Sequence, residues 1–245
     1  MRKWQFEVQL EEKGLKYESH IHSYNNALML INGSPEMTQR YKELLDVLTE
    51  ISDDMIIEEF NTKRHQGIKS ISDAINTLID MKLVEKGWDR QSPIFNKPDL
   101  YQRGSTRWTL DFSCQEGIAL EVAFNHGEAV AWNLIKPTLA SSINGNIEKR
   151  IETNVGIIIC ATSELKKKGN FDGAIGDYEK FLRYLLPLYA MLSKPLLIIG
   201  LEAPEKFEII EKKRKVNGKT KVEQRDFVIY DEITKEPIFV ESLLK

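Results

Sequence analysis

The chain has 245 residues, of which 42% are hydrophobic and 29% charged, so it is long enough to bury a substantial core. Because this length is short for two domains of ordinary size, we expect one globular domain over residues 1–245. The net charge of −3 and the pI near 5.9 do not favour a polyanion-binding protein. Any affinity for a polyanion must therefore come from how the basic residues are distributed.

The cysteines and the apolar runs limit the location of the protein. Cys114 and Cys160 lie in apolar segments, which indicates buried reduced thiols and excludes a disulfide framework or a CxxC metal site. The N-terminal segment alternates charged and apolar residues and does not resemble a signal peptide. No apolar run approaches the ~20 residues of a membrane helix. We expect a soluble, cytoplasmic protein without a membrane partner.

Residues 35–90 are predicted to form a helical region. Apolar residues recur there at intervals of three and four, which is helical spacing. Ser34 and Pro35 supply an N-cap followed by proline at the first helical position, and Ser72-Asp73 after Ser70 supplies a second start signal. These signals predict two or three helices between Pro35 and Gly87.

The middle of the chain predicts a β-hairpin. Residues 106–112 and 118–124 alternate in polarity with a period of two, and a short segment ending at Gly117 separates them. In the second strand, Glu121, Ala123 and Asn125 share one face. The following residues, 128–139, have a helical pattern.

Two compact apolar runs, residues 155–160 and 196–200, flank an amphipathic segment from residue 175 to residue 192. A strand, a helix and a second strand in this order form a βαβ unit. We therefore predict that the two strands are parallel and lie in the centre of a sheet.

A second hairpin is predicted in the C-terminal extension, residues 205–240. Asn217-Gly218 is a strong turn signal between residues 207–216 and 219–230. From Glu208 to Asp226 the segment contains four acidic residues and seven basic ones, namely Lys212, Lys213, Arg214, Lys215, Lys219, Lys221 and Arg225. This cluster is a candidate for contacts with phosphates. The alternative is a solvated hairpin, since charged strands also protect sheet edges from aggregation.

Asp111 and Glu121 are the candidate catalytic pair. One lies at the end of the first central strand and the other in the middle of the second, so the two carboxylates can converge beside the sheet. Magnesium prefers hard oxygen ligands, and one or two carboxylates with a main-chain carbonyl and a phosphate oxygen suffice to hold it. Such an ion offsets charge on a scissile phosphate and activates water. Acids on the solvent face of a hairpin are ordinary, so spacing alone supports the catalytic interpretation only weakly.

The active-site segment resembles that of a known family. Glu121-Val122-Ala123-Phe124, after an Asp-Phe dipeptide at Asp111, is similar to the BglII/BstYI-like type II restriction endonucleases of the PD-(D/E)XK nuclease superfamily. The similarity runs from Ser34 to Leu201. Four further segments follow in the same order, at residues 83–88, 155–160, 177–179 and 195–200.

This resemblance implies an α/β fold with a restriction-endonuclease-like core, in which helices flank a mixed central sheet. The catalytic core would span residues 100–201, after an N-terminal helical region and before the C-terminal β-hairpin. The implied function is Mg²⁺-dependent, sequence-specific hydrolysis of double-stranded DNA at a short palindromic site. The implied partners are duplex DNA and a second copy of the chain in a homodimer, without an organic cofactor.

The resemblance also implies roles for individual residues. Asp111 and Glu121 match the metal-binding acids, and the carbonyl of Val122 would be a further ligand. Ala123 departs from the pattern, because the superfamily has lysine there and relatives of BglII have glutamine or glutamate. We expect Asn125 to take this catalytic role; the other candidates are Glu128 and Lys136.

The residues after the catalytic strand enter the major groove in this family, where amides and imidazoles read base edges. Asn125 and His126 occupy these positions, although His126 could instead cap the following helix. Residues 141–150 are polar and end in Lys149 and Arg150, which suits a DNA-contacting loop. An ordinary surface loop is the alternative.

Two other functions remain open. Residues 35–88 also resemble a winged helix-turn-helix, in which a helix at residues 70–82 would enter the groove of DNA. Asp73 and Asp80 on that helix argue against this function. The second alternative is a nuclease fold that binds DNA without cutting it, because of Ala123.

Overall fold

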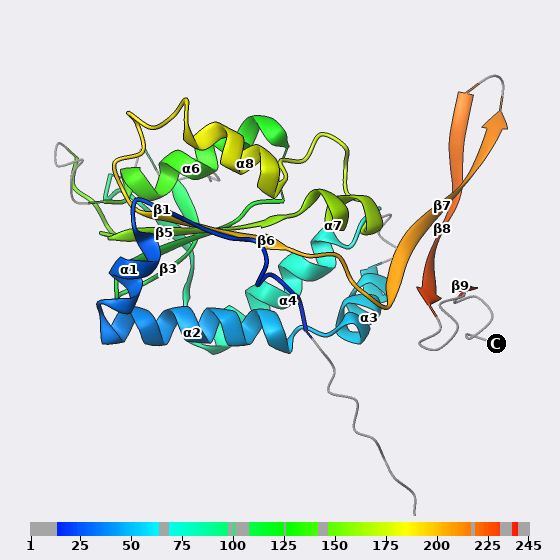
Figure 1. Ribbon diagram of the computed structural model, residues 1–245, viewed down its shortest axis with the longest axis horizontal. Coiled ribbons are helices and arrows are strands. Elements are labelled where there is room, and N and C mark those ends of the chain that lie inside the picture. Colours follow the sequence, from blue (N-terminus) through cyan, green and yellow to red (C-terminus); the bar gives the residue numbers. More distant parts are fainter. Residues whose placement is uncertain are drawn as a thin grey trace, which may run out of the picture.

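A six-stranded sheet forms the centre of the computed structural model (Figure 1), which describes residues 14–63, 69–97, 100, 108–124, 126–141, 147–216, 219–230 and 237–239. The strand order is β1-β6-β5-β4-β3-β2. The strands are β1 (Ile21–Tyr24), β2 (Asp89–Pro93), β3 (Thr109–Cys114), β4 (Ile118–Val122), β5 (Val155–Ala161) and β6 (Leu196–Leu201).

The sheet is mixed, as predicted. β4, β5 and β6 are parallel, whereas β3 is antiparallel to β4, β2 to β3, and β1 to β6. The predicted βαβ unit is therefore confirmed: β5 lies inside the sheet, and only β1 lies beyond β6. Every residue of β4, β5 and β6 is buried, which explains why these segments are nearly continuous apolar runs.

Helices cover both faces of this sheet (Figure 1). They are α1 (Ala27–Asn32), α2 (Pro35–Glu50), α3 (Asp53–Lys63), α4 (Ser72–Glu85), the 3₁₀ turn η2 (Gly127–Ala129), α6 (Val130–Leu139), α7 (Ser163–Lys168) and α8 (Tyr178–Leu185). α2 and α4 lie on one face of the sheet, and α6 and α8 lie on the other.

The alternation of side chains along the strands divides the core between these layers. Leu120 and Ile157 pack into the larger apolar cluster with α2 and α4. Ala123 and Ile158 pack into a second cluster with α6 and α8. Full burial of an aliphatic side chain contributes roughly 1.5–3 kcal/mol. Because this burial is favourable, the alternation of side chains decides which face of the sheet each residue of β4 occupies.

The helix start signals are confirmed in part. Ser34 accepts a hydrogen bond from the Met37 N–H at 3.2 Å, and Pro35 begins α2. α4 begins at Ser72 as expected, but Ile71 occupies the cap position and no side chain caps the helix. The Ser70 hydroxyl contacts the Ser72 hydroxyl at 2.5 Å.

Several predicted boundaries move for local reasons. β3 extends to Cys114, and the turn to β4 occupies only residues 115–117, because Gly117 adopts φ 92°, which favours glycine. The amphipathic segment at 175–192 forms a helix only over α8. Pro187 has no N–H to continue the ladder of hydrogen bonds beyond it.

The C-terminal hairpin has the predicted bounds. β7 (Phe207–Val216) and β8 (Lys219–Tyr230) are antiparallel, and β9 (Pro237–Phe239) extends them into a second sheet. The hairpin projects from the helical body beside α3 and α7 (Figure 1). Its base is attached where the Lys206 N–H donates to Asp53 Oδ2 at 3.1 Å and where Phe207 is buried in the core.

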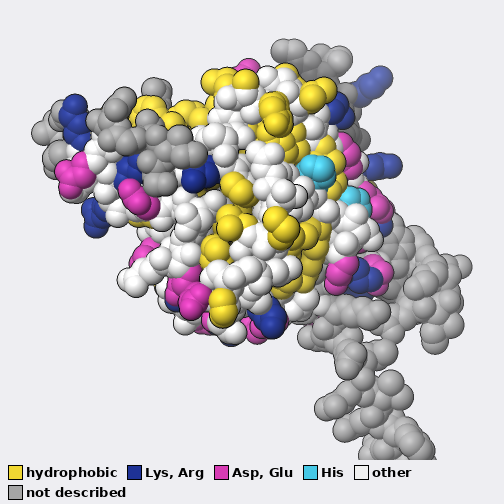
Figure 2. All heavy atoms as spheres, turned by 60° about the vertical axis from the view of Figure 1, so that its left-hand side comes forward, with side chains coloured by type: hydrophobic (Ala, Val, Ile, Leu, Met, Phe, Trp, Pro, Cys, Tyr) yellow, Lys and Arg dark blue, Asp and Glu magenta, His cyan; other side chains and the backbone are white. Residues whose placement is uncertain are grey.

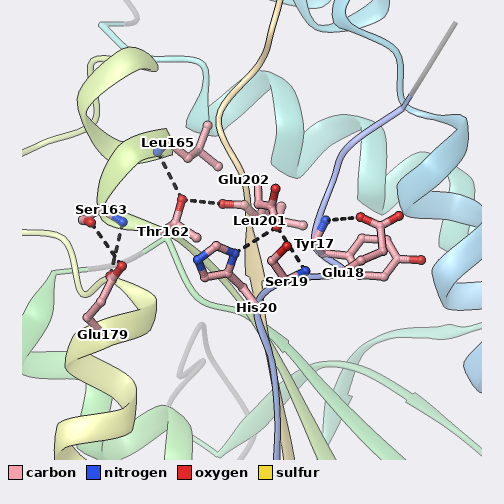
Figure 3. A network of polar contacts seen from close by, with 10 residues as sticks. All are labelled: Tyr17, Glu18, Ser19, His20, Thr162, Ser163, Leu165, Glu179, Leu201 and Glu202. Carbon is pink, nitrogen blue, oxygen red and sulfur yellow. Dashed lines mark hydrogen bonds and ion pairs between the residues drawn. The ribbon is translucent and has the colours of Figure 1, made fainter.

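Polar contacts tie the carboxyl ends of β5 and β6 to the segment before β1 (Figure 3). His20 Nδ1 lies 2.9 Å from Glu202 Oε1, which also accepts the Ser19 N–H at 3.2 Å. The Thr162 hydroxyl donates to the Leu201 carbonyl and caps α7 by accepting the Leu165 N–H. These contacts hold the edge strand in register.

Exposed apolar side chains gather on the face that carries α1 (Figure 2). Met29 is 71% exposed, and Tyr189 and Met191 are 64% and 58% exposed. Asn25, just before α1, donates a hydrogen bond to the Leu192 carbonyl at 3.3 Å and so links α1 to the segment after α8. Such patches are typical of protein–protein contacts.

None of the helices in the described part of the chain has the length and apolar character needed to cross a bilayer.

Close packing of α6 on β5 positions the later part of α6. A Cβ atom at Gly156 would lie 2.5 Å from Pro137 Cβ and 2.6 Å from Leu196 Cδ2. Side chains larger than hydrogen therefore have no space at this position. Pro137 directly follows Lys136, so this contact also determines where the lysine stands.

We expect Gly156→Ala to lower the free energy of unfolding by about 1–3 kcal/mol, the usual cost of an added methyl group in a packed core. Urea denaturation would measure it. The matched control is Gly173→Ala, because a Cβ there meets nothing within 4 Å. Equal stability of the two variants would contradict this account of the α6–β5 contact.

Candidate active site

The two predicted catalytic acids lie where β3 and β4 separate. Paired residues of the two strands end at Phe112↔Leu120. Beyond this point the Val122 N–H donates to Asp111 Oδ2 at 2.9 Å. The Asp111 carboxylate thus lies between the strand ends, beside the main chain of Val122. The structure brings together the three groups that the sequence proposed as metal ligands.

Glu121 is almost fully buried, with 1% of its surface exposed, and it points to the side of the sheet covered by α6. Its Oε2 forms an ion pair with the ammonium of Lys136, whose side chain is 8% exposed. Lys136 also donates to the Thr109 carbonyl at 3.3 Å. The carboxylate therefore has a buried cationic partner that arrives from a helix.

The surroundings disfavour the charged forms of both acids. Burial, together with the negative charge of Asp111, raises the pKa of Glu121 to about 8, although Lys136 opposes the shift. Burial also raises the pKa of Asp111, against the lowering effects of Lys136, the Val122 N–H and the Gln91 side chain. The two carboxyl groups place negative charge where a cation would neutralise it.

These residues fit a divalent metal ion. Glu121 Oε1 is buried and has no hydrogen-bond partner among the described residues, so an oxygen ligand remains unused. The donors are carboxylate and carbonyl oxygens, which suit Mg²⁺. Within the same part of the chain, no group of three or more His, Cys, Asp or Glu side chains could hold a metal.

A cavity of about 270 Å³ opens beside Asp111 and Val122. Its other lining residues are Asn76, Thr77 and Asp80 of α4, Arg90 and Gln91 of β2, and Phe112. Asp80 Oδ1 forms an ion pair with Arg90 Nε at 2.6 Å. Gln91 adopts φ 49°, a strained conformation that occurs often at functional sites.

The sequence analysis missed this wall of the site. Thr77 and Asp80 are three residues apart and so share one face of α4, while Ile75 and Ile79 are buried on the other. The spacing of Thr77 and Asp80 is the signal in the sequence that indicates this wall of the site. The structure places α4 against the sheet as one side of an acidic cavity, not as a free recognition helix.

The other predicted residues have different surroundings. Asn125 lies outside the described residues. His126 is exposed and occupies the N-cap position of η2, but its side chain makes no capping hydrogen bond. Arg150 is exposed and lines a cavity of about 660 Å³. By contrast, Lys149 Nζ is buried without a described hydrogen-bond partner, and burial lowers its pKa.

The basic cluster that was predicted to contact phosphates lies on the C-terminal hairpin. Lys213, Arg214 and Lys215 lie in β7, and Lys215 is exposed. The side chains of Lys213 and Arg214 lie outside the part of the chain that the structure describes.

Ala123 is buried in the cluster formed with α6 and α8. Of the candidates to replace its missing function, Glu128 is exposed on η2, whereas Lys136 contacts Glu121 directly.

The pair of acids should make stability depend on pH. The folded-state pKa of Glu121 is raised from 4.5 to about 8, so the folded state binds its proton more tightly. This contribution to stability is fully present below pH 4.5 and is lost as pH rises through about 8. Removing the charge of Asp111 should reduce that loss.

We expect Asp111→Asn to raise the free energy of unfolding at high pH by about 1 kcal/mol, because it removes the repulsion between two neighbouring carboxylates. The asparagine oxygen still accepts the Val122 N–H, and the gain should shrink at acidic pH. Urea denaturation in EDTA at both pH values measures this, with Asp54→Asn as an exposed control. A loss of stability at high pH would contradict the electrostatic account.

Comparisons with known proteins agree with this geometry. The chain matches the family described as restriction endonuclease BglII/BglIII over residues 19–201. A crystal structure of restriction endonuclease BglII complexed with a DNA 16-mer is similar, with a TM-score of 0.54 and 19% identity over 90% of this chain and 97% of that chain. Free BglII has a TM-score of 0.48 and 20% identity over 89% and 97% of the respective chains. No curated protein sequence matches. The chain therefore belongs to the BglII/BglIII restriction endonuclease family, and as a member it is a type II site-specific deoxyribonuclease.

Proposed function

We propose that the protein hydrolyses phosphodiester bonds of double-stranded DNA at a short palindromic site and requires Mg²⁺. The observation that carries this proposal is the position of Asp111 and Glu121 at the separated ends of β3 and β4, where Glu121 Oε1 is buried and has no hydrogen-bond partner among the residues that the structure describes. The relative described as complexed with a DNA 16-mer supports duplex DNA as the substrate.

The residues would share the reaction as follows. Asp111, Glu121 and the Val122 carbonyl would hold the ion, which when bound offsets charge on the phosphate and activates water. The cavity beside Asp111 gives the phosphate a place to enter. Asn125 and His126 would read the edges of DNA bases. Arg150, which is exposed, would contact the phosphate backbone of the DNA. Lys149 would first have to leave its buried position.

Replacing either acid with alanine should abolish cleavage, by about a thousandfold or more, since several kcal/mol of charge stabilisation are lost. Binding to the cognate duplex should persist, because other residues make those contacts. Plasmid digestion with Mg²⁺ or EDTA measures the first effect, and gel shift in Ca²⁺ the second. The control is Glu58→Ala, an exposed acid on α3. Normal rates for both Asp111→Ala and Glu121→Ala would remove them from the metal site.

We also propose a homodimer on DNA. A palindrome presents two identical half-sites, and one active site cuts one strand, so a two-fold symmetric pair is the simplest way to cut both. The apolar patch around Met29 and Tyr189 is one surface that such a dimer could bury.

Sedimentation of the protein with its cognate duplex should show two chains per duplex. A duplex carrying a single half-site is the control and should bind with lower affinity. One chain per cognate duplex at saturating protein would contradict the symmetric arrangement.

Phosphate contacts are proposed for the basic hairpin. Replacing Lys213, Arg214 and Lys215 with glutamine should weaken binding to cognate and random duplexes alike. Each phosphate contact contributes about 0.9 to the slope of log affinity against log salt, so the slope should flatten by about two to three units. Fluorescence anisotropy across a salt series measures this, with Lys167→Gln on α7 as an exposed control. An unchanged slope would mean that these side chains are solvated and make no phosphate contacts.

A further inference from the structure

The strand that carries Glu121 has no side chain able to touch a phosphate at the next position on the same face. Ala123 is 2% exposed and packs in the same apolar cluster as Val130 and Leu134 of α6. A long side chain at this position would have to displace those residues, since packed cores tolerate added atoms poorly. The missing group must therefore come from another element.

Lys136 stands on the same helix, two residues after Leu134. Its ammonium reaches Glu121 Oε2 and the Thr109 carbonyl, so it lies between β3 and β4 at the active-site end of both strands. The side chain is 8% exposed, and lysine is rarely buried unless it is paired. The contact of Pro137 with Gly156 fixes the helix at this point.

The ammonium has one donor in reserve. Lysine carries three N–H donors, and the partners that the structure describes, Glu121 Oε2 and the Thr109 carbonyl, account for two. Lysine also acts as a compact point charge toward phosphate. Lys136 thus combines the position and the chemistry that Ala123 lacks.

We propose that Lys136 is a catalytic residue of this nuclease, donating hydrogen bonds from α6 to the scissile phosphate and to the attacking water beside Glu121. This inference rests on the proposed function. In the reaction, the water oxygen forms a bond to phosphorus and releases a proton to solvent, while the phosphorus–oxygen bond to one sugar breaks and that oxygen takes a proton from solvent. Lys136 makes and breaks no covalent bond; it stabilises the charge that develops.

The alternative is a lysine that only neutralises buried Glu121, and two substitutions separate these roles. Lys136→Arg keeps the positive charge but replaces the compact ammonium with a planar guanidinium. Lys136→Met keeps much of the apolar stem and removes the charge. The matched control is Lys166→Met, because Lys166 is also a partly buried lysine on a helix, bound to the Ile175 carbonyl and to Asp177.

The experiment measures three quantities for the full-length protein: the rate of duplex cleavage in Mg²⁺, the affinity for duplex in Ca²⁺, and the midpoint of thermal unfolding as a function of added Mg²⁺. The cleavage rate should fall by about 100-fold or more for Lys136→Met and by about tenfold or more for Lys136→Arg, within the range for loss of a charge-stabilising donor. Duplex affinity should stay within about threefold.

The Mg²⁺ titration supplies a readout that does not depend on activity. Removing a cation beside two carboxylates should leave Mg²⁺ affinity unchanged or make it tighter, whereas Glu121→Gln should weaken it. Lys166→Met should match the wild type in rate and in Mg²⁺ affinity.

Three results would overturn the proposal: a wild-type rate for Lys136→Arg, which would identify a simple counterion; a wild-type rate for Lys136→Met; or loss of Mg²⁺ binding in Lys136→Met together with its activity. If Lys136→Met does not fold, Lys136→Arg decides the question, because it preserves the buried ion pair. A wild-type protein that cleaves no duplex in Mg²⁺ would instead refute the proposed function itself.

Discussion

The hydrogen bond from the Val122 N–H to Asp111 Oδ2 is the interaction on which the site depends. In a continuous antiparallel ladder that N–H would have a main-chain partner on the neighbouring strand. Here the side chain of Asp111 takes this role, so β3 and β4 separate without leaving the donor unsatisfied. The separation brings one carboxylate to the edge of a cavity while the other, Glu121, stays buried behind it.

Such an arrangement costs stability. Two carboxyl groups with raised pKa values are held near one buried ammonium, and one carboxylate oxygen has no described partner. A protein selected for stability alone would replace Glu121 with an apolar residue, as its neighbours on β4 show. Gln91, whose backbone is strained, lies beside the carboxylate of Asp111. Concentration of unfavourable features at one place is the usual signature of a functional site.

Much of the fold could be predicted from the sequence, because local patterns report local geometry. Alternating polarity located β3 and β4, apolar runs located β5 and β6, and Asn217-Gly218 located the turn between β7 and β8. The positions of Asp111 and Glu121 followed from the same pattern with the help of the family resemblance. Boundaries were less accurate where a single residue decides them: β3 runs past its predicted end to the turn at Gly117, and α8 ends before Pro187.

The contributions of α4 and α6 to the site could not be predicted in this way. Asp80 lies on α4 and Lys136 on α6, whereas Glu121 lies on β4. How close these side chains come to the site depends on how the two helices pack against the sheet. The burial of Lys149 is a similar case, because its sequence context suggested an exposed loop. Contacts of this kind arise from tertiary packing and leave no periodic pattern in the chain.

The pairing of alanine at position 123 with lysine at position 136 is consistent with one packing constraint. α6 lies so close to β5 that Pro137 leaves room only for glycine at position 156, and Val130 and Leu134 join Ala123 in one cluster. A helix this close needs a small residue on β4, which removes the long side chain from the strand. The same closeness brings residue 136 of the helix to Glu121. Tight packing of α6 thus excludes a lysine from the strand and, by the same geometry, admits one from the helix.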